Sequence, residues 1–381
     1  MVERRKLLFV RETSGNFGGI ESQIDRLADA ASAKGALEPA LLTTSRSSPL
    51  SRRFIAKGRG VFVLPMGRLD ALRAPERLAR ELDPSSVAVL ESHMLRESFV
   101  GRALKRRWPG ITHVFRAHTY IDCSWIAQWR KRAYHLADRL TSGGVDLYLA
   151  NGRAVKDEIV GRSGVDAAKV EVVLNGCDAP EGAAASNWES VEPPPPLLAM
   201  VANLIEHKGH DTLIRALALL GARGVNARAR LVGSETADPR QTERVRRLAA
   251  ELGVLDRLEF VGFAESVAPA LAGVPVLALP SDAEGLPLSI LEGMSLGKLV
   301  VASRVGAVPE CITDGRDGFL HAPGDAPALA AVLERIFTTP ASSLKTVAEA
   351  ARETWRARFR VETMISELGR RYGERLGIEV Y

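Results

Sequence analysis

Short apolar runs recur along the chain, and most are followed by a turn and a helix with one apolar face. The runs are four to six residues long and rich in Val, Leu and Ile, which is typical of buried parallel strands. In the first half they are residues 6–10, 39–43, 61–64, 87–90, 112–115, 146–150 and 170–174. Helices are predicted between them, among them 21–34, 95–108 and 124–141. This alternation predicts an α/β fold with a parallel sheet covered on both faces.

A second series of strands and helices follows a stretch of different composition. Residues 179–196 are rich in Ala, Glu, Ser and Pro and end in four prolines, which is typical of a stiff linker. Strands are then predicted at 197–202, 228–233, 258–263, 274–279 and 299–302. A chain of 381 residues is too long for one compact core. We therefore predict a first domain at 1–178, a linker at 179–196, a second domain at 197–360 and a closing helix at 361–381.

Composition indicates which class of protein this is and in which compartment it is expected. Hydrophobic residues make up 46% of the chain and charged residues 25%, as in soluble globular proteins. The three cysteines, Cys123, Cys177 and Cys311, are far apart and form no C-x-x-C pair, which favours a reducing cytoplasm. The apolar core near the start is too short for a signal peptide, and no run approaches the roughly 18 apolar residues of a membrane span. We therefore expect a cytoplasmic protein.

Positive charge gathers in one part of the first half. The net charge is +5, and residues 96–139 hold ten Lys or Arg against three acids. Aromatic residues lie in the same predicted helices, among them Trp108, Trp125 and Trp129. Such helices can bind the anionic surface of a membrane peripherally, although ordinary helices with inward apolar faces would show a similar pattern. No nucleic-acid-binding motif accompanies the charge, so no nucleic-acid partner is expected.

The stretch 280–297, PSDAEGLPLSILEGMSLG, carries the clearest candidate chemistry. It begins after an apolar strand, turns through Gly285 and enters a helix in which Pro287 suits the first position. Free backbone N–H groups at such a helix start can bind an anion. Glu284 lies at the turn, and Glu292 follows eight residues later, two turns into the predicted helix. A nucleotide sugar would match this arrangement, although two acids near a helix start can also be ordinary surface residues.

This stretch resembles the E-x7-E signature of retaining glycosyltransferase family 4, which has the two-domain GT-B fold. Further family motifs follow in order between residues 197 and 335, including a GxxPE segment in which Ala307 replaces the usual second Gly. In the first half, the loop from Gly18 and Gly19 to Glu21 resembles the family GG-[IV]-E loop, and 175–178 reads N-G-C-D. The resemblance implies two Rossmann-like domains facing across a cleft, and a C-terminal helix that crosses back to the first domain.

The resemblance also implies roles for individual residues. The diphosphate of the donor would contact the N–H groups of Gly285, Leu286 and Leu288 and the ammonium of Lys208. Glu284 would accept hexose hydroxyls, Glu292 ribose hydroxyls, and His118 would lie near the donor sugar. Further implied contacts are Gly18 and Gly19 with the phosphates, Phe263 with the base, and Arg116 and Tyr120 with acceptor or phosphate. Asn203 is also counted among the candidate donor-binding residues, although the family usually has an Arg at this place, and the next alternative Arg position holds Ile205.

The implied activity is retaining transfer of a hexose from a UDP- or GDP-sugar to a glycan, lipid-linked or polysaccharide acceptor. No cofactor or metal is expected, because the chain contains no D-x-D motif, and it also lacks the P-loop pattern. Two other functions stay open. A GT-B-fold epimerase would act on the nucleotide sugar itself, and a non-catalytic relative would only bind it, as the replacement at Asn203 could suggest.

Overall fold

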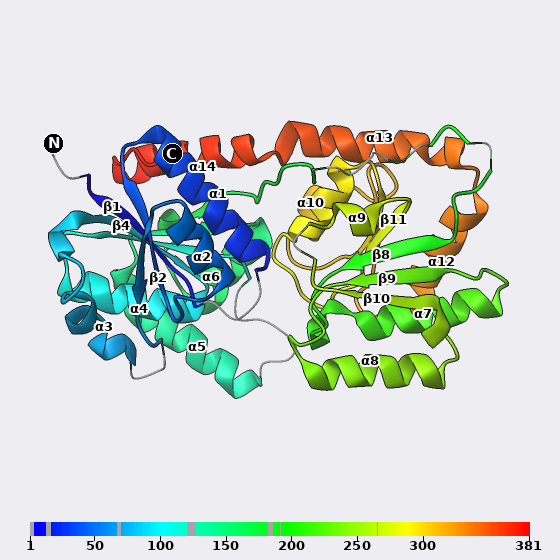
Figure 1. The fold of residues 1–381 in the computed structure, drawn as a ribbon, viewed down its shortest axis with the longest axis horizontal. Coiled ribbons are helices and arrows are strands. Elements are labelled where there is room, and N and C mark those ends of the chain that lie inside the picture. The colour runs from blue at the N-terminus through cyan, green and yellow to red at the C-terminus, as the bar shows by residue number, and fades with distance from the viewer. Residues whose placement is uncertain are drawn as a thin grey trace. The chain divides into compact units, whose positions relative to one another are not determined.

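The chain folds into two compact units that are described separately. The computed structural model describes residues 4–12, 17–66, 70–119, 127–181, 186, 188–190, 192–264 and 266–381. The first unit comprises Met1–Leu174 together with Glu362–Tyr381, and the second comprises Asn175–Val361. The stretch expected to be a linker therefore belongs to the second unit, and the closing helix belongs to the first (Figure 1).

The first unit is built on a seven-stranded parallel sheet in the order β3-β2-β1-β4-β5-β6-β7. Its strands are β1 (Lys6–Val10), β2 (Glu38–Thr43), β3 (Gly60–Val63), β4 (Val87–His93), β5 (Thr112–Ala117), β6 (Leu147–Ala150) and β7 (Val170–Val172). Its helices are α1 (Gly19–Lys34), α2 (Pro49–Ala56), α3 (Asp70–Leu78), α4 (Leu95–Arg107), α5 (Gln128–Thr141), α6 (Arg153–Ser163) and α14 (Val361–Leu376). The strand order reverses between β1 and β4, and ligands of open α/β sheets bind at the carboxyl ends of strands at such a point.

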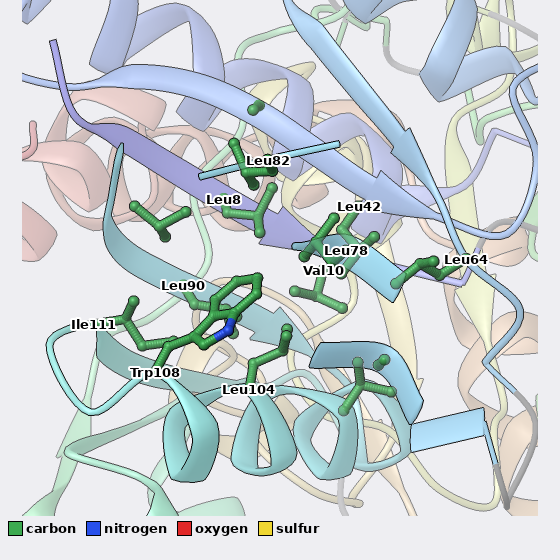
Figure 2. Close-up of a cluster of buried hydrophobic side chains, with 14 of the residues drawn as sticks. Leu8, Val10, Leu42, Leu64, Leu78, Leu82, Leu90, Leu104, Trp108 and Ile111 are labelled. Carbon is green, nitrogen blue, oxygen red and sulfur yellow. The ribbon is translucent and has the colours of Figure 1, made fainter. Parts of the chain in front are cut away.

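The core under this sheet is formed by β1, β2, β4 and the two helices α3 and α4. Figure 2 shows Trp108 and Leu104 from the end of α4 beneath Leu90 and Leu8. Trp108 is only 7% exposed, so it packs in the core and is not available at the surface. Val100 and Leu104 of α4 are buried as well, so this helix fits the alternative of an ordinary helix with an inward apolar face.

The main difference from the predicted strands is the length of β4. It continues three residues beyond the apolar run, through Glu91, Ser92 and His93, and all three side chains are fully buried. The alternation of apolar and polar residues would end the strand at Leu90, because buried acids and histidines are rare without partners. Here the partners come from β5 and from α14, which lies far away in the sequence.

The second unit is built on a six-stranded parallel sheet in the order β10-β9-β8-β11-β12-β13. Its strands are β8 (Leu197–Val201), β9 (Arg228–Val232), β10 (Leu258–Gly262), β11 (Val276–Leu279), β12 (Leu299–Ser303) and β13 (Phe319–His321). Its helices are α7 (His210–Ala222), α8 (Pro239–Glu251), α9 (Ala268–Leu271), α10 (Leu288–Ser295), α11 (Val308–Cys311), α12 (Ala326–Thr338) and α13 (Ala341–Arg358). The order reverses between β8 and β11, so the loops after these two strands meet at one edge.

Both units have the Rossmann-like α/β architecture that the sequence predicts. The two cysteines within the described ranges, Cys177 and Cys311, are buried thiols, whereas Cys123 lies outside those ranges. In the part of the chain that the structure describes, no helix has the length and apolarity needed to cross a membrane.

Candidate active site

The loops after β8 and β11 touch through their backbones. Gly209 has a φ of +76°, and a Cβ atom there would lie 1.8 Å from the carbonyl oxygen of Pro280. The N–H of Asp282 donates to the carbonyl of His207 over 2.8 Å. Only glycine permits such an approach without displacing the neighbouring chain. The Lys208–Gly209 turn is therefore locked against the start of the 280–288 loop.

A second close approach holds the same loop from its other side. Gly306 has a φ of +52°, and a Cβ there would lie 1.8 Å from the carbonyl oxygen of Glu284. The next residue, Ala307, is fully buried and donates its N–H to the carbonyl of Gly285 over 3.0 Å. Ala307 has a φ of −88°, which any residue can adopt. The replacement of the usual second Gly by Ala307 is thus accommodated.

These approaches bring two of the predicted site residues together. The Nζ atom of Lys208 lies 2.7 Å from Oε1 of Glu284, and the hydroxyl of Ser281 donates to the same oxygen over 2.7 Å. The Glu284 side chain is 5% exposed and that of Lys208 20%, so the ammonium keeps access to solvent. Oε2 of Glu284 has no hydrogen-bond partner among the described residues. Ser281 was not among the predicted site residues, and its role follows only from the turn geometry.

Lys208 is flanked by two histidines that carry no charge at neutral pH. Burial, and after it the charge of Lys208, lowers the pKa of both His207 and His210 to about 3. The positive charge of this loop therefore lies on Lys208.

The three N–H groups predicted to bind a diphosphate are open. No acceptor among the described residues pairs with the N–H of Gly285, Leu286 or Leu288. The turn is nevertheless held on its carbonyl side. The carbonyl of Gly285, which shares a peptide plane with the N–H of Leu286, accepts from Ala307, and the carbonyl of Leu286 accepts from the Asn175 side chain over 2.7 Å. Open N–H groups on a rigid turn form a preorganised anion site. Asn175, in the N-G-C-D segment, is thus a supporting residue.

The helix in this stretch begins one residue later than predicted. Pro287 is the N-cap, with a ψ of 132°, and α10 starts at Leu288, a shift within the usual uncertainty of helix ends. Glu292 comes four residues after Leu288, which is about one turn into the helix and not the predicted two, and its side chain is half-buried.

Asn203 has a structural role at the neighbouring strand end. Its Oδ1 atom accepts the N–H of Ser234 over 2.9 Å, immediately after Gly233, where a Cβ would lie 2.1 Å from the carbonyl oxygen of Ala202. The residue that replaces the family Arg thus joins the loops after β8 and β9. Phe263 follows β10 and is 43% exposed, so its ring is available for stacking.

In the first unit, the Gly18–Gly19 loop forms the start of α1. Gly18 is the N-cap, and its N–H donates to Oε2 of Glu21 over 3.0 Å, which is the backbone half of a capping box. The guanidinium of Arg11 bridges Glu21 and Glu97, with both distances 2.9 Å. The glutamate of the GGIE motif therefore shapes the loop, and Gly19 is the first helical residue.

His118 lies in a buried cluster at the ends of β4 and β5. Its Nε2 atom is 2.8 Å from Nδ1 of His93, and the two rings stack at 5.1 Å. Burial is the largest cause that holds the pKa of both rings well below 6.5, and the nearby charges of Arg116 and Arg11 act in the same direction. Both histidines are thus neutral at physiological pH. Arg116 is 1% exposed, so it is not available to an acceptor, and Tyr120 lies outside the described residues.

The basic residues between 96 and 139 divide into two groups. Arg102 pairs with Asp138, Lys105 pairs with Asp146 at 2.9 Å, and both Arg116 and Lys131 are buried. The exposed ones are Arg96, Arg106, Arg107, Arg130, Arg132 and Arg139. Four of the ten basic residues are therefore buried or partly buried, and the predicted basic surface is reduced to the other six.

Comparison with known proteins decides the family. A family model described as Glycosyltransferase Family 4 matches residues 17–180, and one described as Glycosyl transferases group 1 matches residues 195–339. D-inositol 3-phosphate glycosyltransferase 2 of Catenulispora acidiphila is 30% identical over 305 residues, which are 72% of this chain and 69% of that protein.

The chain belongs to glycosyltransferase family 4.

Other relatives extend the similarity to most of this glycosyltransferase. D-inositol 3-phosphate glycosyltransferase of Actinosynnema mirum is 28% identical over 359 residues, covering 86% of this chain and 85% of that protein. Two crystal structures share its fold at 20% identity and a TM-score of 0.79: a glycosyltransferase of Rickettsia africae, covering 98% of this chain and 99% of that one, and Anabaena HepE with UDP and glucose, covering 96% and 99%. The predicted GT-B fold is confirmed.

Substituting the two close-approach glycines should disrupt the site loops. We expect Gly209→Ala and Gly306→Ala each to cost several kcal/mol of unfolding free energy in the second unit, because a Cβ would overlap a carbonyl oxygen. Gly253→Ala is the matched control, since its φ is +65° and nothing lies within 4 Å of its Cβ. It should cost only about 1–2 kcal/mol for the left-handed conformation. Thermal and denaturant unfolding measure the difference, and equal losses in all three variants would contradict the close-approach account.

Proposed function

We propose that this glycosyltransferase moves a hexose from a UDP- or GDP-sugar to a hydroxyl of a glycan, lipid-linked or polysaccharide acceptor, with retention of anomeric configuration and without a metal. The observation that carries the proposal is the Lys208–Glu284 pair at 2.7 Å beside the open N–H groups of residues 285–288. One side of this loop suits a diphosphate and the other suits sugar hydroxyls. The UDP and glucose bound to HepE support the choice of donor class.

Each residue has a defined part in the proposed reaction. The ammonium of Lys208 can turn toward a diphosphate because it is partly exposed and has three N–H donors. Oε2 of Glu284 accepts a hexose hydroxyl, while Oε1 keeps Lys208 and Ser281 in place. Glu292 accepts the ribose hydroxyls and Phe263 stacks on the base. His118 accepts a hydrogen bond from a sugar hydroxyl, and Gly18 and Gly19 allow backbone to approach phosphate.

The proposed step breaks the bond between the anomeric carbon and the diphosphate oxygen, which leaves with the electron pair. The acceptor oxygen bonds to the anomeric carbon from the same face and gives its proton to the departing phosphate. Negative charge on the diphosphate grows during this step, so fixed N–H groups and Lys208 stabilise the transition state more than the bound donor. No side chain is required as nucleophile.

We also propose that α5 binds an anionic membrane surface. Trp129, Leu136 and Leu140 are 68%, 57% and 75% exposed. With exposed Ala133 they form a stripe at helical spacing, which suits insertion into the headgroup region. Exposed Arg130, Arg132 and Arg139 on the same helix match anionic lipid phosphates in charge. Of the two basic helices considered from the sequence, the proposal keeps α5 and leaves out α4, in which Val100 and Leu104 are buried.

Donor turnover tests the proposed reaction. A panel of UDP-, GDP- and ADP-sugars, with glycan, lipid-linked and inositol 3-phosphate acceptors, should identify one donor that is transferred with retention. We expect Lys208→Met and Glu284→Gln to lower kcat by roughly 10²-fold to 10³-fold, because each removes a fixed partner of the reacting groups. Lys345→Met is the matched control, since Lys345 pairs with Glu189 at 2.6 Å on the exposed surface of the same unit.

The same panel separates the alternatives. A donor that binds without turnover would indicate a non-catalytic relative, and conversion of the nucleotide sugar without acceptor would indicate an epimerase. Equal activity of Lys208→Met and Lys345→Met would contradict the role of the Lys208–Glu284 pair.

Binding to vesicles tests the membrane proposal. Wild-type protein should bind phosphatidylglycerol vesicles, and binding should weaken as salt is raised, because the Arg residues interact electrostatically with the surface. Trp129→Ser with Leu140→Ser should reduce it further by removing the inserted side chains. Ile55→Ser on α2, with Ile55 45% exposed, is the control. Equal binding by the α5 variant and the control, or no binding by the wild type, would rule out this surface.

A further inference from the structure

Glu91 is a fully buried acid that joins the end of β4 to the C-terminal segment. Its Oε2 atom accepts the hydroxyl of Tyr372 over 2.5 Å and that of Tyr381 over 3.0 Å. The two rings pack edge to face at 5.5 Å. Burial and the nearby charge of Glu91 raise the pKa of both phenols well above 10, so both keep their protons and donate. The C-terminal segment thus fixes one oxygen of the carboxylate.

The other oxygen of Glu91 faces the histidine cluster. Oε1 lies 3.4 Å from Nε2 of His93 and 3.9 Å from Nη1 of Arg116. Within the described part of the chain none of these three buried atoms makes a hydrogen bond, so they face one another as the nearest unpaired polar atoms. An ionised carboxylate only accepts hydrogen bonds. The proton on neutral His93 therefore belongs on Nε2, toward Glu91, which leaves Nδ1 with its lone pair.

This choice determines the tautomer of the second histidine. Nδ1 of His93 and Nε2 of His118 are 2.8 Å apart, and one of two neutral rings must donate. Because Nδ1 of His93 is the acceptor, His118 carries its proton on Nε2. Nδ1 of His118, which has no partner among the described residues, then presents a lone pair.

We propose that Glu91, Tyr372 and Tyr381 are positioning residues that, through His93, fix His118 in the Nε2–H tautomer so that its Nδ1 atom accepts a hydrogen bond from a sugar hydroxyl. The part of this proposal that concerns the sugar rests on the proposed function. The C-terminal segment is then a component of the site and not only a cover on the first sheet. Carboxylates that orient a histidine tautomer in this way commonly change activity by 10-fold to 100-fold or more when altered.

The tautomers can be measured without any substrate. Long-range proton–nitrogen NMR correlations on the full chain with labelled histidine distinguish Nδ1–H from Nε2–H rings. His93→Gln and His118→Gln assign the two signals among the seven histidines. We expect both rings as Nε2–H in the wild type. In Glu91→Gln the new amide can donate to Nε2 of His93, so both rings should change to Nδ1–H.

Enzyme kinetics complete the test. Glu91→Gln should lower kcat for transfer by roughly 10-fold to 100-fold, and Tyr372→Phe and Tyr381→Phe should each lower it less. The control is Tyr148→Phe, because Tyr148 is a buried phenol of the same unit whose hydroxyl meets Asp138 at 3.4 Å and does not contact Glu91. It should leave tautomers and kcat unchanged.

The outcomes separate this proposal from the proposed function. An Nδ1–H ring at His118 in the wild type, or unchanged tautomers in Glu91→Gln, would overturn the positioning role. Reversed tautomers in Glu91→Gln with unchanged kcat would overturn the link to catalysis. Absence of transfer from any donor, with the expected tautomers, would overturn the proposed function but not the role of Glu91 in fixing the tautomers of His93 and His118.

Discussion

The Lys208–Glu284 pair depends on two places where backbone lies against backbone too closely for any side chain. Gly209 against Pro280 and Gly306 against Glu284 bring three loops of the second sheet into one rigid group. Within it, carbonyls are tied by hydrogen bonds and N–H groups stay open. An arrangement of this kind needs no reorganisation when negative charge arrives, and that is the condition under which fixed dipoles stabilise a transition state best.

In the first unit, the feature that needs explanation is a group of buried polar side chains at the end of β4. Glu91, His93 and Arg116 are each at most 1% exposed, and burial of such groups is unfavourable unless partners surround them. Tyr372 and Tyr381 supply two of these partners from a segment more than 280 positions away in the sequence. These two hydrogen bonds help to explain why the C-terminal segment packs on the first sheet. They also link the position of that segment to the histidines through Glu91.

The apolar periodicity of the sequence predicted where strands and helices lie, but it did not predict where a strand continues through polar residues. The bounds of β1 and α14 agree with the predicted 6–10 and with the expected closing helix starting at 361, because both have clear apolar periodicity. The end of β4 was missed, since Glu91 and His93 are unfavourable in a buried strand until partners distant in sequence are known. Likewise, charge counting could not show that Arg102 and Lys105 pair internally, nor that Asn203 joins two loops through Ser234.

The central claim is that the open turn at residues 285–288 and Lys208 hold the diphosphate of the donor. A crystal structure of the protein with the nucleoside diphosphate that binds best tests it most directly. The account predicts phosphate oxygens about 3 Å from the N–H groups of Gly285, Leu286 and Leu288, with Nζ of Lys208 contacting both the diphosphate and Glu284. A diphosphate bound away from this turn, or a Lys208 that keeps Glu284 as its sole partner, would contradict it.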